Sequence, residues 1–127
     1  MELIHAYSRQ QAIMDGFLVD VSETAKEAGF KYPVALTHAA YEACVAWTST
    51  DSEKAGVPQD EGGRLWDVVY MAMLNARRSQ ASEFIYELFC VPRGGSKTNP
   101  QSTKLKAVCG PGDSLDPVIT IMLPDED

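Results

Sequence analysis

The clearest hydrophobic pattern along the chain is helical and runs from about Asp60 to Arg78. Apolar residues recur there at intervals of three and four positions, the spacing that places side chains on one face of a helix. The main row consists of Leu65, Val68, Val69, Ala72, Met73 and Ala76, and Trp66, Tyr70 and Leu74 form a second row. Asp67, Asn75 and Arg78 form a narrow polar stripe beside these rows. We therefore expect a central helix that the rest of the fold covers on most sides.

Beyond Gln80 the hydrophobic pattern becomes typical of strands. The segment "EFIYELFCV" is rich in aromatic and branched residues, "TKLKAVCG" alternates polar and apolar positions, and "PVITIMLP" is almost wholly apolar. The two connections, "PRGGSKTNPQS" and "GPGDSLD", contain the glycine, proline and polar residues of loops. Three strands in an antiparallel meander are the simplest arrangement.

The first half of the chain is divided into short elements by capping and stop signals. Ser8 with Gln11 has the form of a capping box for a helix over "RQQAIMD", which Gly16 should end. The next segment, "FLVDV", favours a strand that could join the edge of the meander. Ser22 should cap a helix over "ETAKEA" that ends at Gly29.

The following residues predict an extended segment, one more helix and a loop. "FKYP" should be extended because Pro33 disfavours helical geometry at Tyr32. Thr37 can cap a core-facing helix that reaches about Trp47. The stretch "STDSEKAGVPQDEGG" is interpreted as an exposed loop.

Together these elements predict an α+β fold. Its N-terminal helices should pack on one face of a C-terminal antiparallel sheet of three to four strands. At 127 residues the chain fits one domain, residues 1–127, whose acidic tail at 124–127 we expect to be frayed.

Charge and cysteine content exclude some classes of function. The net charge of −7 opposes direct binding to a nucleic-acid backbone, although an acidic protein can dock on a basic partner. Three widely spaced cysteines, without a Cys-x-x-Cys pair, predict neither a disulfide framework nor a zinc site. The N-terminal residues have no signal-peptide pattern and no apolar run is long enough to cross a bilayer, so we expect a soluble, cytoplasmic protein with no membrane partner.

No group of residues predicts a catalytic, cofactor-binding or metal site. Asp15 and Asp20 could be paired carboxylates, but a helix end and an outward strand position explain them better. "GPGDS" resembles a phosphate-binding loop only in its glycines. A cysteine and histidine dyad would need His5 with Cys90 or Cys109, because His38 and Cys44 fall on different helix faces. The sequence therefore favours a protein that is not an enzyme.

Four aromatic residues, Tyr41, Trp47, Trp66 and Tyr70, lie at helical spacing. Residues in this pattern usually belong to the core. An exposed aromatic pair would instead indicate a surface that binds a partner. Burial decides between the two interpretations.

Three blocks of the sequence carry a resemblance to a known family. They are "YSRQQAIMDGFLVDVSETAKEAGFKYPVALT", "GRLWDVVYMAML" and "GPGDSLDPVITIMLPDED". In this order they resemble a family of small uncharacterised bacterial proteins found on plasmids, integrative elements and phages. The resemblance implies a setting and no activity or site residue. Small acidic proteins of such elements often act against host defences.

We therefore expect a non-enzymatic accessory protein of a mobile element or phage that binds a host protein or complex. The partner would be a defence complex with a nucleic-acid channel, such as a CRISPR effector or a restriction enzyme. The carboxylates expected to meet its lysines and arginines are those of Asp113, Asp116, Asp125, Glu126 and Asp127. One alternative is a small enzyme or ligand-binding domain with a pocket built from distant residues. The other is a structural subunit of a conjugation or regulatory assembly.

Overall fold

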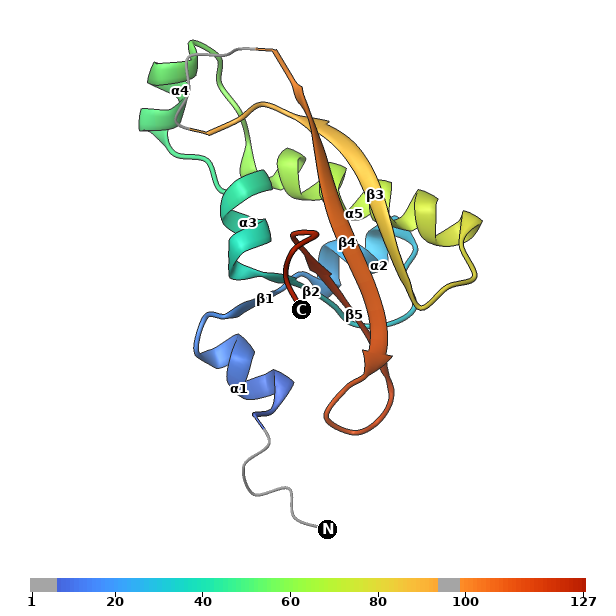
Figure 1. Cartoon of the computed structure of the whole chain (residues 1–127). Helices are drawn as coiled ribbons and strands as arrows, with labels where there is room; N and C mark the ends of the chain where they lie inside the picture. The colour runs from blue at the N-terminus through green and yellow to red at the C-terminus, as the bar shows by residue number, and fades with distance from the viewer. Residues whose placement is uncertain (1–6, 94–98) are drawn as a thin grey trace.

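The computed structural model describes residues 7–93 and 99–127, which form five helices and five strands (Figure 1). The helices are α1 (Arg9–Met14), α2 (Ser22–Ala28), α3 (His38–Cys44), α4 (Ser49–Ala55) and α5 (Glu61–Arg78). The strands are β1 (Leu18–Asp20), β2 (Val34–Thr37), β3 (Glu83–Cys90), β4 (Gln101–Pro111) and β5 (Pro117–Met122). The α+β class is as expected.

The strands form one sheet in the order β1-β2-β5-β4-β3. The predicted meander of β3, β4 and β5 is confirmed as antiparallel. The sheet is nevertheless mixed and larger than predicted, because β2 lies parallel to β5 and carries β1 on its other side. Strand β2 was not predicted, because "VALT" is only four residues long and leads straight into a helix.

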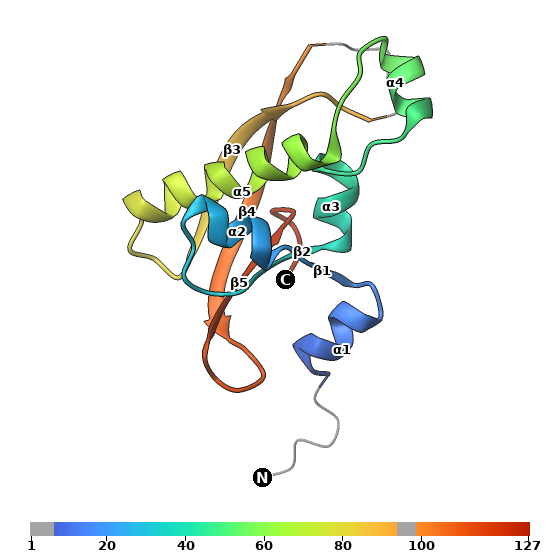
Figure 2. The same ribbon diagram turned by 180° about the vertical axis from the view of Figure 1, so that it is seen from behind.

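The core lies between one face of this sheet and three helices. The register aligns one row of apolar side chains across all five strands. The three central members belong to the main hydrophobic cluster, and the two outer ones pack against it. The row is Val19, Leu36, Ile121, Ala107 and Phe84. Figure 2 shows α2 and α5 crossing the same side of the sheet. Val68 and Val69 of α5 belong to the same cluster.

Several predicted helix ends are confirmed. Ser8 and Gln11 form the capping box of α1, and Thr37 accepts a hydrogen bond from the backbone amide of Ala40. Gly29 ends α2 with a positive φ of 112°. Ser22, however, is the first residue of α2 and not its cap, because its hydroxyl bonds to Asp20 and Val34.

Helix α4 corrects the interpretation of residues 49–63 as a loop. Thr48 and Asp51 form a second capping box, and Gly56 stops the helix at a φ of 75°. The helix has no apolar stripe to reveal it, since its buried residues are only Asp51 and Ala55. Ala55 packs with Trp47 and Val91 in a small second cluster.

Within residues 7–93 and 99–127, no helix has the length and apolar character needed to cross a membrane.

Candidate functional site

An exposed aromatic pair lies on α5. The rings of Trp66 and Tyr70 are one helical turn apart and stack with centroids 5.6 Å apart and an interplanar angle of 15°. Their exposed fractions are 37% and 41%. The expectation that α5 is covered on most sides is therefore wrong here, because α5 lies on the outside of a two-layer fold. By the criterion of burial, these two rings are surface residues and not core residues.

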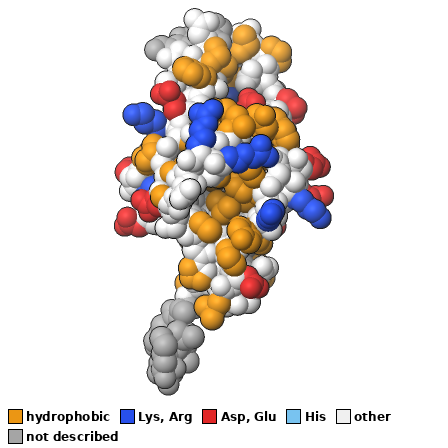
Figure 3. Space-filling view, turned by 90° about the vertical axis from the view of Figure 1, so that its right-hand side faces the viewer, with side chains coloured by type: hydrophobic (Ala, Val, Ile, Leu, Met, Phe, Trp, Pro, Cys, Tyr) orange, Lys and Arg blue, Asp and Glu red, His pale blue; other side chains and the backbone are white. Residues whose placement is uncertain are grey.

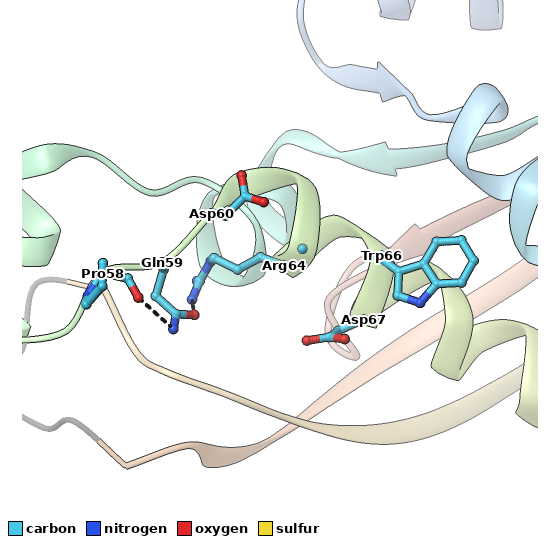
Figure 4. A pocket seen from close by; sticks show the side chains of 7 residues that line it. Pro58, Gln59, Asp60, Arg64, Trp66 and Asp67 are labelled. Atoms are coloured by element: carbon cyan, nitrogen blue, oxygen red, sulfur yellow. Dashed lines mark hydrogen bonds between the residues drawn. The ribbon is translucent and has the colours of Figure 1, made fainter.

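Beside Trp66 lies an open cleft of about 580 Å³ between the loop before α5 and the first turns of that helix. Asp60 and Asp67 line it and are exposed. Asp60 also accepts a hydrogen bond from the Gly62 amide at 3.3 Å, as the cap of α5. Figure 4 shows both carboxylates with Trp66 along the same stretch of helix. The aromatic pair and the two carboxylates form an acidic aromatic face, a name kept below for Asp60, Trp66, Asp67 and Tyr70.

Arg64 forms the floor of the same cleft and is only 5% exposed. Its guanidinium donates to the carbonyl oxygens of Val45 at 3.0 Å and Val91 at 2.9 Å, and lies 4.7 Å from the centre of the Trp47 ring. Figure 4 shows it reaching toward Gln59. Arg64 therefore holds the α3–α4 junction and the end of β3 against α5. Burial lowers the pKa of this group from its ordinary value.

A second hollow, of about 300 Å³, lies between the segment after α2 and the C-terminal end of α5. Phe30, Tyr32, Phe84 and Ile119 line it. Figure 3 shows this face as an apolar band with lysine and arginine side chains beside it and acidic side chains farther out. Two adjoining depressions share Phe30 and Tyr32 with the hollow, and their lining includes the basic residues Lys26, Lys31 and Arg77. In the described part of the chain they form no ion pair. We call this the basic-rimmed groove.

The carboxylates predicted to bind a partner lie in two separate parts of the chain, the β4–β5 loop and the C-terminal turn. Asp113 accepts hydrogen bonds from the backbone amides of Arg9 at 2.7 Å and Gln10 at 3.0 Å, and these bonds lower its pKa. Asp116 of the same loop is exposed. Asp113 thus fastens the start of α1 to the loop between β4 and β5.

Glu126 also bonds within the chain. Its carboxylate accepts from the Thr37 hydroxyl at 2.7 Å and from the Leu123 amide at 2.8 Å, which ties the C-terminal turn to β2. Asp125 and Asp127 are exposed. Of the five predicted carboxylates, Asp116, Asp125 and Asp127 are thus the ones most available to a partner.

The other residues weighed for chemistry have local roles. The Asp15 carboxylate accepts a hydrogen bond from the Tyr7 hydroxyl, and this bond raises the pKa of Tyr7 to about 12. Asp20 accepts from the amide and hydroxyl of Ser22. His38 is exposed at the start of α3, and His5 lies outside the described residues. No group of three or more His, Cys, Asp or Glu side chains in the described segments is arranged to hold a metal ion.

The fold and these surfaces define a small α+β domain with an open cleft at the start of α5 and an apolar groove near its C-terminal end. All 127 residues match the model of a family of unknown function, DUF6573, and the chain belongs to that family. Comparison with curated proteins and with solved structures finds no match.

Sequence reasoning missed the buried arginine, although a signal was present. Arg64 lies four residues before Val68 and one before Leu65, on the side of α5 where the apolar row begins. A charged residue in an apolar row indicates a buried polar contact, because isolated buried charge is costly. The exposure of Trp66 and Tyr70 had no such signal, since their spacing is also that of core residues.

Proposed function

We propose that this protein is a non-enzymatic binding protein whose docking surface is the acidic aromatic face of α5. The observation that carries the proposal is the exposed stack of Trp66 on Tyr70. Large aromatic side chains provide much of the binding energy in protein interfaces, because they bury a large area with few rotatable bonds. The two stacked rings lie beside the open cleft at the start of α5, a position that suits contact with another surface.

The chemistry of this face favours a basic partner. An arginine or lysine of the partner can lie over the exposed aromatic stack while Asp60 and Asp67 pair with its charge. The net charge of −7 would speed the approach of such a partner. Binding should therefore weaken as salt concentration rises.

The biological role we propose is that of an accessory protein of a mobile element or phage that inhibits a host defence complex. Nucleic-acid channels of CRISPR effectors and restriction enzymes present the lysines and arginines that the acidic aromatic face would accept. The sequence resemblance to small proteins of plasmids, integrative elements and phages supports this setting. A cytoplasmic location belongs to the same proposal.

The test is an affinity purification from a bacterial lysate that carries active defence systems, after nuclease treatment. The tagged wild-type chain is compared with a Trp66→Ala/Tyr70→Ala variant. Phe17→Ala is the matched control, because Phe17 is an exposed aromatic residue on another part of the surface. We expect a stoichiometric partner with the wild type and the control, released by salt, and loss of that same partner from the double variant.

The acidic tail and loop can be tested separately from this face. Asp116→Asn, Asp125→Asn and Asp127→Asn remove three exposed charges without disturbing the hydrogen bonds of Asp113 and Glu126. If these carboxylates meet the partner, the triple variant binds more weakly at low salt. Unchanged affinity would confine the charged contact to Asp60 and Asp67.

The basic-rimmed groove supports a second candidate function, the binding of a small anionic amphipathic ligand. Its apolar lining would take a hydrocarbon or aromatic body, and Lys31 or Arg77 would take the charge. Decanoate is a suitable probe, with decanol as the uncharged control. Stabilisation by decanoate that is lost in a Lys31→Gln/Arg77→Gln variant would support this function. Equal effects of both probes would indicate only nonspecific apolar contact.

The third possibility, a structural subunit of a larger assembly, predicts stable self-association. Sedimentation of the wild type and the Trp66→Ala/Tyr70→Ala variant separates it from binding to a host protein. A dimer that the double substitution dissociates would favour the structural role.

A further inference from the structure

Two cysteines from distant parts of the chain meet where α3 and β3 both end. Cys44 is the last residue of α3 and is 1% exposed, in the main hydrophobic cluster. Cys90 is the last residue of β3 and packs against that cluster from a partly exposed position. Both are free thiols. The residues that follow them, Val45 and Val91, each accept a hydrogen bond from the same Arg64 guanidinium, which holds the ends of α3 and β3, and with them the two thiols, close together. The Cys90 thiol is partly exposed to solvent, whereas that of Cys44 is buried.

Two polar side chains, those of Thr103 and Arg64, lie near Cys90. The Thr103 hydroxyl on β4 is 3.3 Å from the Cys90 sulfur. The charge of the buried Arg64 guanidinium acts on both sulfurs. Arg64 Nη2 is also the one buried side-chain nitrogen or oxygen in the described residues that has no hydrogen-bond partner. An unpaired buried donor is costly, so its presence beside two thiols points to an anionic form or adduct as its acceptor.

We propose that Cys90 and Cys44 form a redox site in which Cys90 reacts with a hydroperoxide and Cys44 resolves the product as a disulfide. Cys90 is the attacking residue because it is the more exposed and has a hydroxyl and a cation beside it. Cys44 is the resolving residue because it is buried, adjacent and without a polar partner other than Cys90. The two thiols themselves are not part of the acidic aromatic face, so this activity does not rest on the proposed binding function.

The reaction balances in two steps. The Cys90 thiolate attacks one oxygen of the hydroperoxide; an S–O bond forms, the O–O bond breaks, and the leaving oxygen takes a proton to become an alcohol or water. Sulfur loses two electrons, and the product is a sulfenic acid. The Cys44 sulfur then attacks the Cys90 sulfur, so that an S–S bond forms and the S–O bond breaks. The departing hydroxide takes the Cys44 proton and leaves as water, and an external dithiol restores both thiols by exchange.

The electrostatics agree with these roles. Contact with Cys44 is the largest influence on Cys90 and lowers its pKa. Burial raises the pKa and is the next largest influence, while the Thr103 hydroxyl and the Arg64 charge lower it and Asp67 raises it slightly, so that the pKa is lowered overall. The same contact and burial raise the pKa of Cys44, which therefore keeps its proton. A thiolate at Cys90 beside a protonated Cys44 is the state from which the reaction starts.

The experiment uses the full chain with Cys109→Ser, which removes the exposed third thiol. Reduced protein is treated with hydrogen peroxide at pH 7, and the products are mapped by mass spectrometry. We expect an intramolecular Cys44–Cys90 disulfide that dithiothreitol reverses. With Cys44→Ser added, dimedone should trap a sulfenic acid at Cys90. Hydrogen peroxide should oxidise Cys90 about tenfold faster than it oxidises N-acetylcysteine. The thiolate is the reacting form, and a thiol with a pKa of about 8.5 is only a few per cent thiolate at pH 7.

Substitutions at Thr103 test whether its hydroxyl promotes the oxidation of Cys90. Thr103→Val removes the hydroxyl and should slow Cys90 oxidation by about threefold to tenfold, whereas Thr103→Ser keeps the hydroxyl and should restore the rate. Thermal unfolding of both variants checks that the fold is intact. Oxidation of Cys90 no faster than that of N-acetylcysteine would overturn the proposal. So would a product that passes to sulfinic acid without forming the disulfide.

Discussion

The carboxylate of Asp113 accepts a hydrogen bond of 2.7 Å from the backbone amide of Arg9, across 104 positions of sequence. A second bond, from the Gln10 amide, makes the same carboxylate a cap for the first turn of α1. Asp113→Ala should therefore release α1 from the β4–β5 loop without unfolding the sheet. Hydrogen exchange at Arg9 and Gln10 should speed up, while Asp116→Ala in the same loop should leave both amides as protected as before.

This anchor should also weaken in acid. The two amides lower the pKa of Asp113 in the folded protein. The ionised Asp113 carboxylate therefore stabilises the folded state fully above the ordinary Asp pKa of 3.8. This stabilisation is lost as the pH falls through the lower pKa that Asp113 has in the folded protein. The hydrogen-exchange rates of the Arg9 and Gln10 amides, corrected for the intrinsic effect of pH, should rise as the pH is lowered. Rates that do not change would contradict the role of Asp113.

Gly112 should tolerate no side chain, in contrast to its neighbour Gly110. A Cβ at Gly112 would lie 2.7 Å from Val118 Cγ1 and 3.3 Å from the Asp116 carbonyl oxygen, whereas one at Gly110 meets nothing within 4 Å. We expect Gly112→Ala to lower the free energy of unfolding by about 1–3 kcal/mol through overpacking. Gly110→Ala should change it by less than about 0.5 kcal/mol in denaturant titrations. Equal effects would mean that the loop adjusts to the added methyl group.

Arg64 should be a major contributor to stability. Arg64→Met keeps the apolar stem but leaves the buried carbonyls of Val45 and Val91 without their donor. We expect a loss of about 2–4 kcal/mol in the free energy of unfolding, the range for breaking a buried charged contact. Arg78→Met, at an exposed position of the same helix, is the control and should stay within about 0.5 kcal/mol of the wild type. A small effect at Arg64 would show that water replaces the guanidinium.

The thiol pair predicts a pH dependence of stability. The pKa of Cys90 falls from 9.0 to about 6 on folding, so between these values the unfolded chain binds more protons and stability rises with pH. Cys44 stays protonated in both states below pH 9 and adds nothing in this window. Under reducing conditions, the difference in unfolding free energy between the wild type and Cys90→Ser should therefore grow from pH 6 to pH 9. A constant difference would indicate an ordinary Cys90 thiol.

Strand β3 could be predicted from the sequence and strand β2 could not, and their lengths of eight and four residues explain the difference. Long amphipathic segments such as α5 and β3 carry enough positions for their period to be read, and capping residues such as Thr37 mark their ends. The four residues of β2 are too few for a period, and their place beside β5 depends on parallel pairing across the chain. Helix α4 was missed because capping, and not hydrophobic spacing, defines it.

The candidate sites were harder to predict than the fold because they depend on contacts across the chain. Trp66 and Tyr70 have the spacing of core residues, and only the two-layer architecture leaves them exposed. Cys44 and Cys90 are 46 positions apart, and no sequence motif indicates that they are neighbours in the fold. Asp113 and Glu126 look like free surface charge in sequence, but both bond within the fold.

The most direct test of the binding proposal is the affinity of the purified partner for three forms of the protein, measured by calorimetry at low and at high salt. The forms are the wild type, Trp66→Ala/Tyr70→Ala and Phe17→Ala. We predict that the double substitution weakens binding by about 30-fold or more, corresponding to about 2 kcal/mol, and that Phe17→Ala binds as the wild type does. Equal affinity of all three forms would show that the aromatic stack of α5 is not the docking surface.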